Sequence, residues 1–190
     1  MITNISLTAC EKSNYVNLQR MHYTQNGVQK SWDVAMVHDS VAVLLYHEDN
    51  DAILLVKQFR PAVYLKNNDG YTYELCAGIV DKQLDLATIA KEEILEECGY
   101  DIPVDRLVRL TSFYTSVGFA GSLQTLYYAT IDERYKISDG GGIDDESIEL
   151  IWLPYDEIVS FIVDETKPKT PGLMYACQWF LTQGHLTNRY

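Results

Sequence analysis

Four glutamates lie close together in one short segment of the chain, at Glu92, Glu93, Glu96 and Glu97. In a helix, residues three and four positions apart are neighbours on one face, so these carboxylates would repel one another. Gathered carboxylate oxygens are also the ligands that hard cations such as Mg²⁺ take, together with backbone carbonyls and water. The spacing therefore indicates either a metal-binding helix or a solvated acidic helix face.

The elements around these glutamates are predicted to gather them at one place. A helix is expected from Asp85, as the N-cap, to Cys98, with Gly99 ending it. A strand over residues 71–76 leads into Ala77 and Gly78 just before this helix. The apolar residues at helical spacing predict its buried face; they are Leu86, Ile89, Ala90, Ile94 and Leu95.

The rest of the chain predicts a mixed α+β domain. The dipeptide Asn26-Gly27 between two alternating stretches in the first forty residues is typical of a β-hairpin. Residues 60–70, with Pro61, are expected to form a loop. Further strands are predicted at residues 41–46, 52–59, 106–116, 122–131 and 148–154, and helices near 155–163 and 172–183.

Composition and charge exclude several classes of protein. The chain has 190 residues, 47% of them hydrophobic, and a formal net charge of −12, which disfavours a nucleic-acid surface. The sequence has no apolar run near the roughly 18 residues that a membrane span needs, and its four cysteines form no CxxC pair. We therefore expect a cytoplasmic protein with neither a nucleic-acid nor a membrane partner.

Residues 78–100 resemble the signature of the Nudix hydrolases, G-x5-E-x7-R-E-U-x-E-E-x-G-U, in which U is a bulky apolar residue. The residues in register are Gly78, Glu93, Ile94, Glu96, Glu97, Gly99 and Tyr100. Two positions depart from it, because Leu84 stands where a Glu is expected and Glu92 where an Arg is expected. The resemblance implies that this Arg helps to orient the glutamates, so its absence leaves open a weaker or altered activity.

The resemblance extends from about residue 20 to the C-terminal helix, through segments such as "LVKQFRPAVY" and "ELCAGIVDK". These look like the uridine diphosphate glucose diphosphatase branch of the family, which is related to the ADP-ribose diphosphatases. The resemblance implies an α/β/α sandwich with a mixed sheet, preceded by N-terminal antiparallel strands. It divides the chain into residues 1–40, a dimerisation element, and residues 41–190, the Nudix hydrolase domain.

The implied activity is Mg²⁺-dependent hydrolysis of nucleoside diphosphate sugars by a homodimer, with Mn²⁺ as an alternative cofactor. UDP-glucose would give UMP and glucose 1-phosphate. Two alternatives stay open: an ADP-ribose diphosphatase, and a nucleotide-sugar sensor that binds its ligand without hydrolysing it.

The resemblance also assigns roles to individual residues. The predicted metal ligands are Glu93, Glu97, Glu96 and the carbonyl of Ala77, and Glu96 is also counted among the catalytic residues. A general base is expected from the acidic loop before the last strand. The candidates there are Glu146, then Asp144, with Glu149 disfavoured because it falls inside the strand.

Three further residues form the predicted substrate-binding set. The planar guanidinium of Arg60 can bind two phosphate oxygens at once. Trp32 is a candidate for stacking on the nucleobase, as is Tyr23, although core packing is the competing interpretation of both aromatics. Gly78 is placed at the turn beside the site. The glycines at 140–142 are expected to let the acidic loop close over substrate.

Overall fold

The computed structural model describes residues 2–13, 16–143 and 146–182. These residues divide into two compact units. The first comprises the described residues up to His38 together with Tyr114–Ser122, and the second comprises Asp39–Phe113 together with the described residues from Leu123 onward.

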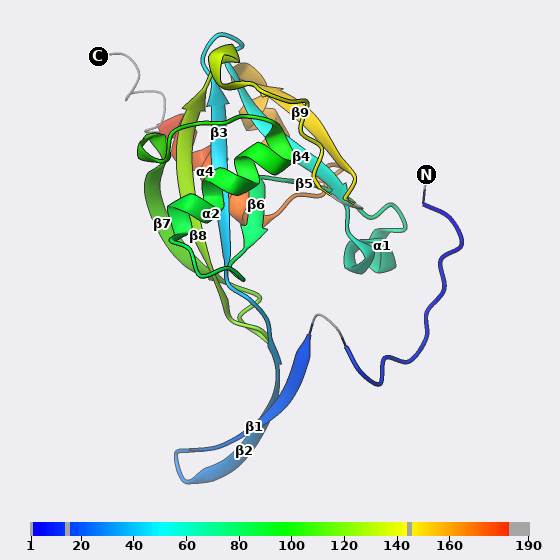
Figure 1. Ribbon diagram of the computed structural model, residues 1–190. Helices are drawn as coiled ribbons and strands as arrows, with labels where there is room; N and C mark the ends of the chain where they lie inside the picture. The colour runs from blue at the N-terminus through cyan, green and yellow to red at the C-terminus, as the bar shows by residue number, and fades with distance from the viewer. Residues whose placement is uncertain (1, 14–15, 144–145, 183–190) are drawn as a thin grey trace. The chain divides into compact units, whose positions relative to one another are not determined.

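The first unit contains a long β-hairpin (Figure 1). Strand β1 (Asn17–Gln25) pairs antiparallel with β2 (Val28–Met36) over their whole length. The turn residues Asn26 and Gly27 have φ values of 55° and 78°, which match the two-residue turn that suits the twist of a hairpin. The hairpin predicted from this dipeptide is confirmed.

The second unit is built on one mixed sheet with the strand order β5-β4-β3-β8-β7. Strand β3 runs parallel to β8 and antiparallel to β4 and β6, and β4 is also antiparallel to β5 and β9. The strands are β3 (Ser40–His47), β4 (Ala52–Phe59), β5 (Tyr71–Glu74), β6 (Cys76–Ile79), β7 (Val108–Thr115), β8 (Ser122–Ile131) and β9 (Ile148–Pro154).

Helices cover both faces of this sheet (Figure 1). Successive residues of a strand point to opposite faces, and in β3 Val41, Val43 and Leu45 pack toward α2 (Leu86–Glu93). The alternate residues of β3 pack toward α3 (Ile158–Val163) and α4 (Pro171–Thr182). This explains why the strand is apolar throughout, and it confirms the predicted α+β sandwich.

The sheet forks between β3 and β4, and this fork positions β5 and β6, which carry Glu74, Ala77 and Gly78. The start of β3, Ser40–Val43, pairs with β6, whereas the end of β4, Val56–Phe59, pairs with β5. The chain crosses from one branch of the fork to the other at Leu75, between β5 and β6. The predicted single strand over residues 71–76 is therefore two strands that belong to different branches.

The prediction of a loop at residues 60–70 was wrong, because α1 (Pro61–Asn67) occupies most of this segment. Proline is compatible with the first helical position, where its missing N–H would have no helical acceptor. Arg60 is the extended N-cap, and Asn68 ends the helix in the left-handed region with φ 59°.

The helix predicted from Asp85 to Cys98 exists, but its last turn is a π-helix, η1 (Ile94–Cys98). Asp85 caps it by accepting from the N–H groups of Ala87 and Thr88, as predicted. The wider π-turn shifts the buried face. As a result Cys98 is fully buried, whereas Leu95, predicted to face the core, is only partly buried.

The described part of the second unit also contains short 3-10 helices, η2 (Val104–Arg106), η3 (Glu133–Tyr135) and η4 (Tyr155–Glu157). Among the described residues, no helix is both long and apolar enough to cross a membrane.

Candidate active site

Glu97 is held against the backbone of β6. Its Oε2 accepts a hydrogen bond from the Ala77 N–H at 2.9 Å, and the residue is only 4% exposed. Burial raises the pKa of Glu97 to about 8, although the Ala77 N–H opposes this shift. The carboxyl group is therefore ionised with difficulty unless a cation joins it.

Glu93 lies against Gly78, the next residue of β6. A Cβ atom on Gly78 would overlap Cδ and Oε1 of Glu93, so only glycine leaves room for this carboxylate. Burial, followed by repulsion from Glu96, raises the pKa of Glu93 to about 7. Two carboxylates of the helix thus converge on two consecutive residues of β6.

Glu92, which stands where the Nudix signature has an Arg, has a lysine beside it. Lys82, in the segment between β6 and α2, donates a hydrogen bond from Nζ to Glu92 Oε2 at 2.6 Å. Its charge also acts on Glu93, where it lowers the pKa against the larger effect of burial. No pattern in the sequence pointed to Lys82, because a lysine ten positions before Glu92 has no helical spacing to it. Leu84, which stands where the signature has a Glu, is exposed.

The glycine-rich loop binds to the end of the same helix. The N–H groups of Gly141 and Gly142 donate to the carbonyls of Glu97 and Glu96, at 2.8 and 3.2 Å. A Cβ on Gly140 would overlap the Glu97 carbonyl oxygen, and all three glycines have positive φ. The glycines therefore fix this loop on the helix that carries the glutamates, which is a different role from the predicted closing movement.

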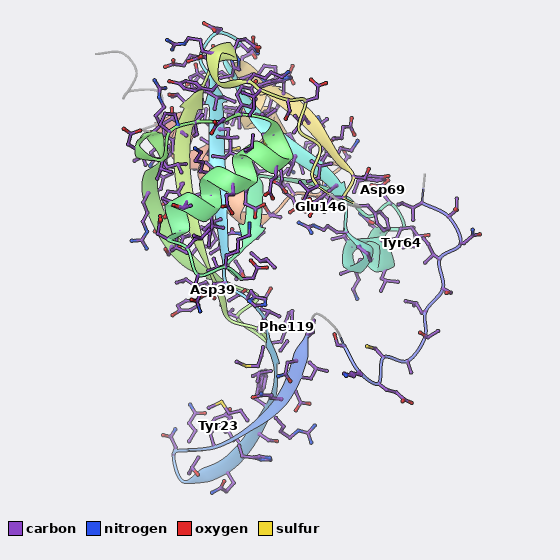
Figure 2. The ribbon with its side chains drawn as sticks, viewed as in Figure 1. Tyr23, Asp39, Tyr64, Asp69, Phe119 and Glu146 are labelled. Carbon is purple, nitrogen blue, oxygen red and sulfur yellow. The ribbon has the colours of Figure 1, made fainter. Side chains whose placement is uncertain are left out.

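Glu146 lies in that loop, at the end of the sheet where β9 begins (Figure 2). Its Oε2 accepts from the Ile143 N–H at 3.2 Å. It interacts electrostatically with both Glu93 and Glu97, raising their pKa values. The structure thus brings Glu146 near the two glutamates, whereas Asp144, the other candidate base, lies outside the described residues.

Arg60 lies between the end of β4 and α1, in the same neighbourhood. Its guanidinium forms a two-pronged ion pair with Glu74, in which Nε and Nη2 each lie 2.7 Å from a carboxylate oxygen. Hydrogen bonding to Glu74 raises the pKa of Arg60, and the charges of Glu97 and Glu146 add to this shift. Glu74 was not among the predicted site residues, although an ionisable residue in a buried strand was a usable signal.

The donor set of this site suits a hard divalent cation. Among the described residues, no three His, Cys, Asp or Glu side chains are arranged as a complete metal cage. Mg²⁺ rarely uses such a cage, since it keeps several waters and takes one or two carboxylates together with substrate phosphates. Glu97, which is buried, and Glu93, which is half-buried, both have raised pKa values and fit that requirement.

Trp32 belongs to the first unit. It is 55% exposed, so the core-packing interpretation was wrong for this residue. Its Nε1 donates to the Gly118 carbonyl at 2.8 Å, and the ring lines a hollow of about 550 Å³ with Arg20 and Asp33. Tyr23 is half-buried on β1 of the same hairpin (Figure 2).

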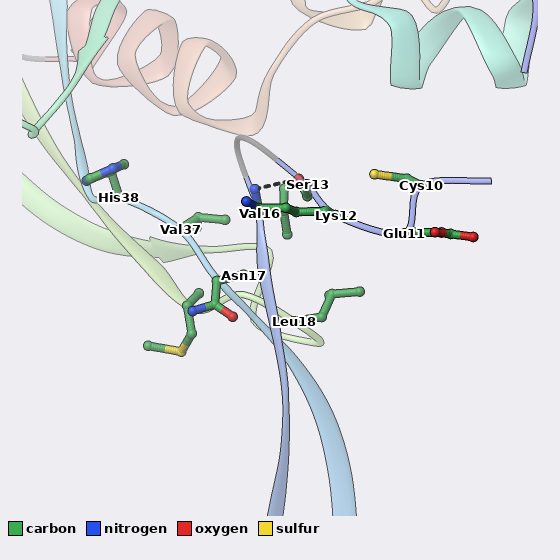
Figure 3. A pocket seen from close by; sticks show the side chains of 10 residues that line it. Cys10, Glu11, Lys12, Ser13, Val16, Asn17, Leu18, Val37 and His38 are labelled. Carbon is green, nitrogen blue, oxygen red and sulfur yellow. Dashed lines mark hydrogen bonds between the residues drawn. The ribbon is translucent and has the colours of Figure 1, made fainter. Parts of the chain in front are cut away.

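A larger cavity of the first unit, about 900 Å³, lies elsewhere (Figure 3). Residues 10–13 form one wall, where Ser13 Oγ accepts from the Val16 N–H at 2.9 Å, and the ends of β1 and β2 form the other. None of the predicted site residues lines it.

The fold and the paired glutamates agree with the family comparison. A model of the NUDIX domain matches residues 36–176, and the chain therefore belongs to the Nudix family. Over 210 aligned residues it is 37% identical to uridine diphosphate glucose pyrophosphatase NUDT14 of Bos taurus, with 95% of both chains covered.

Other relatives have related names. The NUDT14 protein of Mus musculus is 36% identical, with 96% of this chain and 95% of the relative covered. The GDP-mannose pyrophosphatase of Cronobacter sakazakii is 37% identical over 120 residues, which covers 63% of this chain and 61% of that protein.

Proposed function

We propose that this chain hydrolyses the diphosphate bond of nucleoside diphosphate sugars, and that UDP-glucose, giving UMP and glucose 1-phosphate, is its preferred substrate. The observation that carries the proposal is the placement of Glu97 on the Ala77 N–H and of Glu93 against Gly78. The similarity to the NUDT14 proteins over nearly the whole chain supports the choice of substrate.

Mg²⁺, with Mn²⁺ as the second choice, is the proposed cofactor. Glu93, Glu97, Glu96 and the Ala77 carbonyl would hold it. When bound, the metal neutralises phosphate charge and lowers the pKa of a bound water.

The remaining roles belong to the chain's own residues. Arg60 binds phosphate oxygens through N–H groups that are not engaged by Glu74. Glu146 accepts a proton from the water that attacks phosphorus, and the bond between phosphorus and the bridging oxygen then breaks. UMP and glucose 1-phosphate each leave with one of the two phosphoryl groups.

A panel of substrates tests the function. With Mg²⁺ present, we expect kcat/KM for UDP-glucose to exceed that for ADP-ribose and GDP-mannose by about tenfold or more, because sites that hydrogen-bond a particular base reject others. Release of nucleoside monophosphate and sugar phosphate is the measurement, and EDTA should abolish it. Faster turnover of ADP-ribose or GDP-mannose would reverse the ranking. Binding of UDP-glucose without any product would instead identify a sensor.

We also propose a homodimer formed through the hairpin. The register pairs Met21 with Trp32 and Tyr23 with Lys30, so one face of the ribbon carries most of its apolar side chains. Val28, Trp32 and Met36 on that face are each more than half exposed. A two-stranded ribbon is marginally stable by itself, and a second copy would cover this face.

A charge placed on the ribbon tests the dimer. We expect the parent to have a dimeric mass by light scattering at micromolar concentration, and Met21→Glu to be monomeric, because a carboxylate cannot be buried without a partner. Thr24→Glu, on the opposite face of the same strand, is the control and should remain dimeric. A monomeric parent would refute the proposal.

A cytoplasmic location stays a prediction and is tested by fractionation.

A further inference from the structure

The Arg60 backbone is fixed on both sides, so its side chain starts from a defined point. Its N–H donates to the Gly70 carbonyl at 2.7 Å, and its carbonyl accepts from the N–H groups of Val63 and Tyr64 at 2.9 and 3.0 Å. Only the long, flexible side chain is then left to be oriented. An arginine side chain loses much rotamer entropy when it is ordered, so an unheld guanidinium would sample many directions.

Glu74 restricts that freedom. Its two carboxylate oxygens take Nε and Nη2 of Arg60, one each at 2.7 Å, which fixes the plane of the guanidinium as well as its position. The Glu74 side chain is only 9% exposed, whereas that of Arg60 is 46% exposed. The carboxylate of Glu74 is therefore buried, and the guanidinium of Arg60 that it binds is partly exposed.

Thr72 in turn holds Glu74. Both residues lie on β5, two positions apart and hence on the same face of the strand. The Thr72 hydroxyl donates to Glu74 Oε1 at 2.5 Å. Since β5 pairs with β4, which ends one residue before Arg60, the carboxylate has little freedom of its own.

The outward edge of Arg60 is available to a ligand. Glu74 engages two of the five N–H donors of the guanidinium. The other three have no acceptor among the described residues. The charge of Arg60 interacts with those of Glu97 and Glu146, so this edge lies in the field of the candidate site.

We infer that Glu74 is a positioning residue for diphosphate binding, which acts by holding the Arg60 guanidinium with its unengaged N–H groups toward the phosphates. The inference rests on the proposed function, because it needs a phosphorylated substrate. A buried carboxylate beside a phosphate site would otherwise be unfavourable, since its charge opposes that of the substrate. Glu74 offsets this cost because it orders the Arg60 guanidinium in advance, so that binding of substrate does not have to order it.

A double-mutant cycle tests this inference. We expect Glu74→Gln to raise KM for UDP-glucose about tenfold and to change kcat less than about threefold, because an amide keeps the shape of the side chain but cannot accept from both N–H donors. In an Arg60→Ala background, the same substitution should change KM less than twofold, since nothing remains to be positioned. Glu74→Asp should recover part of the loss.

Asp132→Asn is the matched control. Asp132 holds Arg134 through the same two nitrogens, at 2.9 and 2.7 Å, and its side chain is only 8% exposed. This variant loses an ion pair of the same geometry without touching the candidate site, so KM should stay within twofold of the parent. Thermal melting of each variant separates a loss of stability from a loss of positioning.

The outcomes distinguish the inference from the function on which it rests. Equal effects of Glu74→Gln in the parent and Arg60→Ala backgrounds, or an unchanged KM in Arg60→Ala, would overturn the positioning role. If the parent hydrolyses no nucleoside diphosphate sugar, the proposed function is overturned. The same cycle is then measured on the Kd of inorganic diphosphate, where additive effects would again refute the role of Glu74.

Discussion

Replacing Glu97 with Gln should lower kcat for UDP-glucose by at least about 100-fold, which corresponds to roughly 2.7 kcal/mol of transition-state stabilisation. The amide retains the shape of the side chain and its acceptor for the Ala77 N–H, but it removes a charged metal ligand. Steady-state kinetics with saturating Mg²⁺ is the measurement. Near-parental turnover would show that Glu97 holds no catalytic metal.

The same variant should be at least as stable as the parent without metal. The folded pKa of Glu97 is about 8, above the ordinary value of 4.5. Between these pH values the folded protein keeps a proton that the unfolded chain has released, so stability falls as pH rises, by up to about 1.4 kcal/mol per pH unit. Glu97→Gln should lack this contribution. Denaturant unfolding at pH 5 and pH 8 in EDTA measures it.

Added Mg²⁺ should make the parent more stable than Glu97→Gln. Mg²⁺ binds the ionised carboxylates, so it stabilises the parent, and does so more at pH 8 than at pH 6. The gain in Tm on adding Mg²⁺ should be smaller in Glu97→Gln. Glu92→Gln, which removes one charge from the same helix at the residue paired with Lys82, is the control and should keep both the turnover and the Mg²⁺-dependent gain.

Replacing Gly78 with Ala should cause a loss of similar size, about 100-fold in kcat or roughly 2.7 kcal/mol. The new Cβ would overlap the Glu93 carboxylate, and this side chain must move away from β6 to make room. Overpacking of this kind also costs about 1–3 kcal/mol of stability. Kinetics, together with the Tm shift on adding Mg²⁺, separates a displaced carboxylate from a general loss of folding.

Gly118→Ala is the control for this substitution. Gly118 has open space around the position of a Cβ and no positive φ, and its carbonyl, which accepts from Trp32, is retained. Its turnover should stay within about twofold of the parent. A Gly78→Ala enzyme with normal turnover and a normal Mg²⁺ response would show that Glu93 does not need its place against β6.

Sequence alone determined the features that rest on local chemistry. Asn26-Gly27 predicted the hairpin because few other residues accept two consecutive positive φ values. Asp85 and Gly99 predicted the ends of the glutamate-bearing helix because capping is a property of single residues. The spacing of Glu93 and Glu97, together with the Nudix signature, indicated a metal site because helical spacing alone places these two carboxylates on one face.

Only the tertiary structure decided the features that depend on residues distant in sequence. Residues 71–76 look like one strand, but the competition between β3 and β4 for partners divides them at the fork. The π-turn that buries Cys98 in place of Leu95 is a response to packing, which periodicity does not encode. The ion pair of Arg60 with Glu74 likewise forms only when β4 and β5 lie side by side.

The glycine-rich loop illustrates the same division. Its sequence predicted conformational freedom, because glycine adopts positive φ at little cost. In the fold that freedom is used to place backbone N–H groups on the carbonyls of Glu96 and Glu97. These carbonyls end a helix and need donors from elsewhere in the chain. The sequence thus predicted which residues would carry the chemistry, and the packing of the loop and the fork decided how these residues are held.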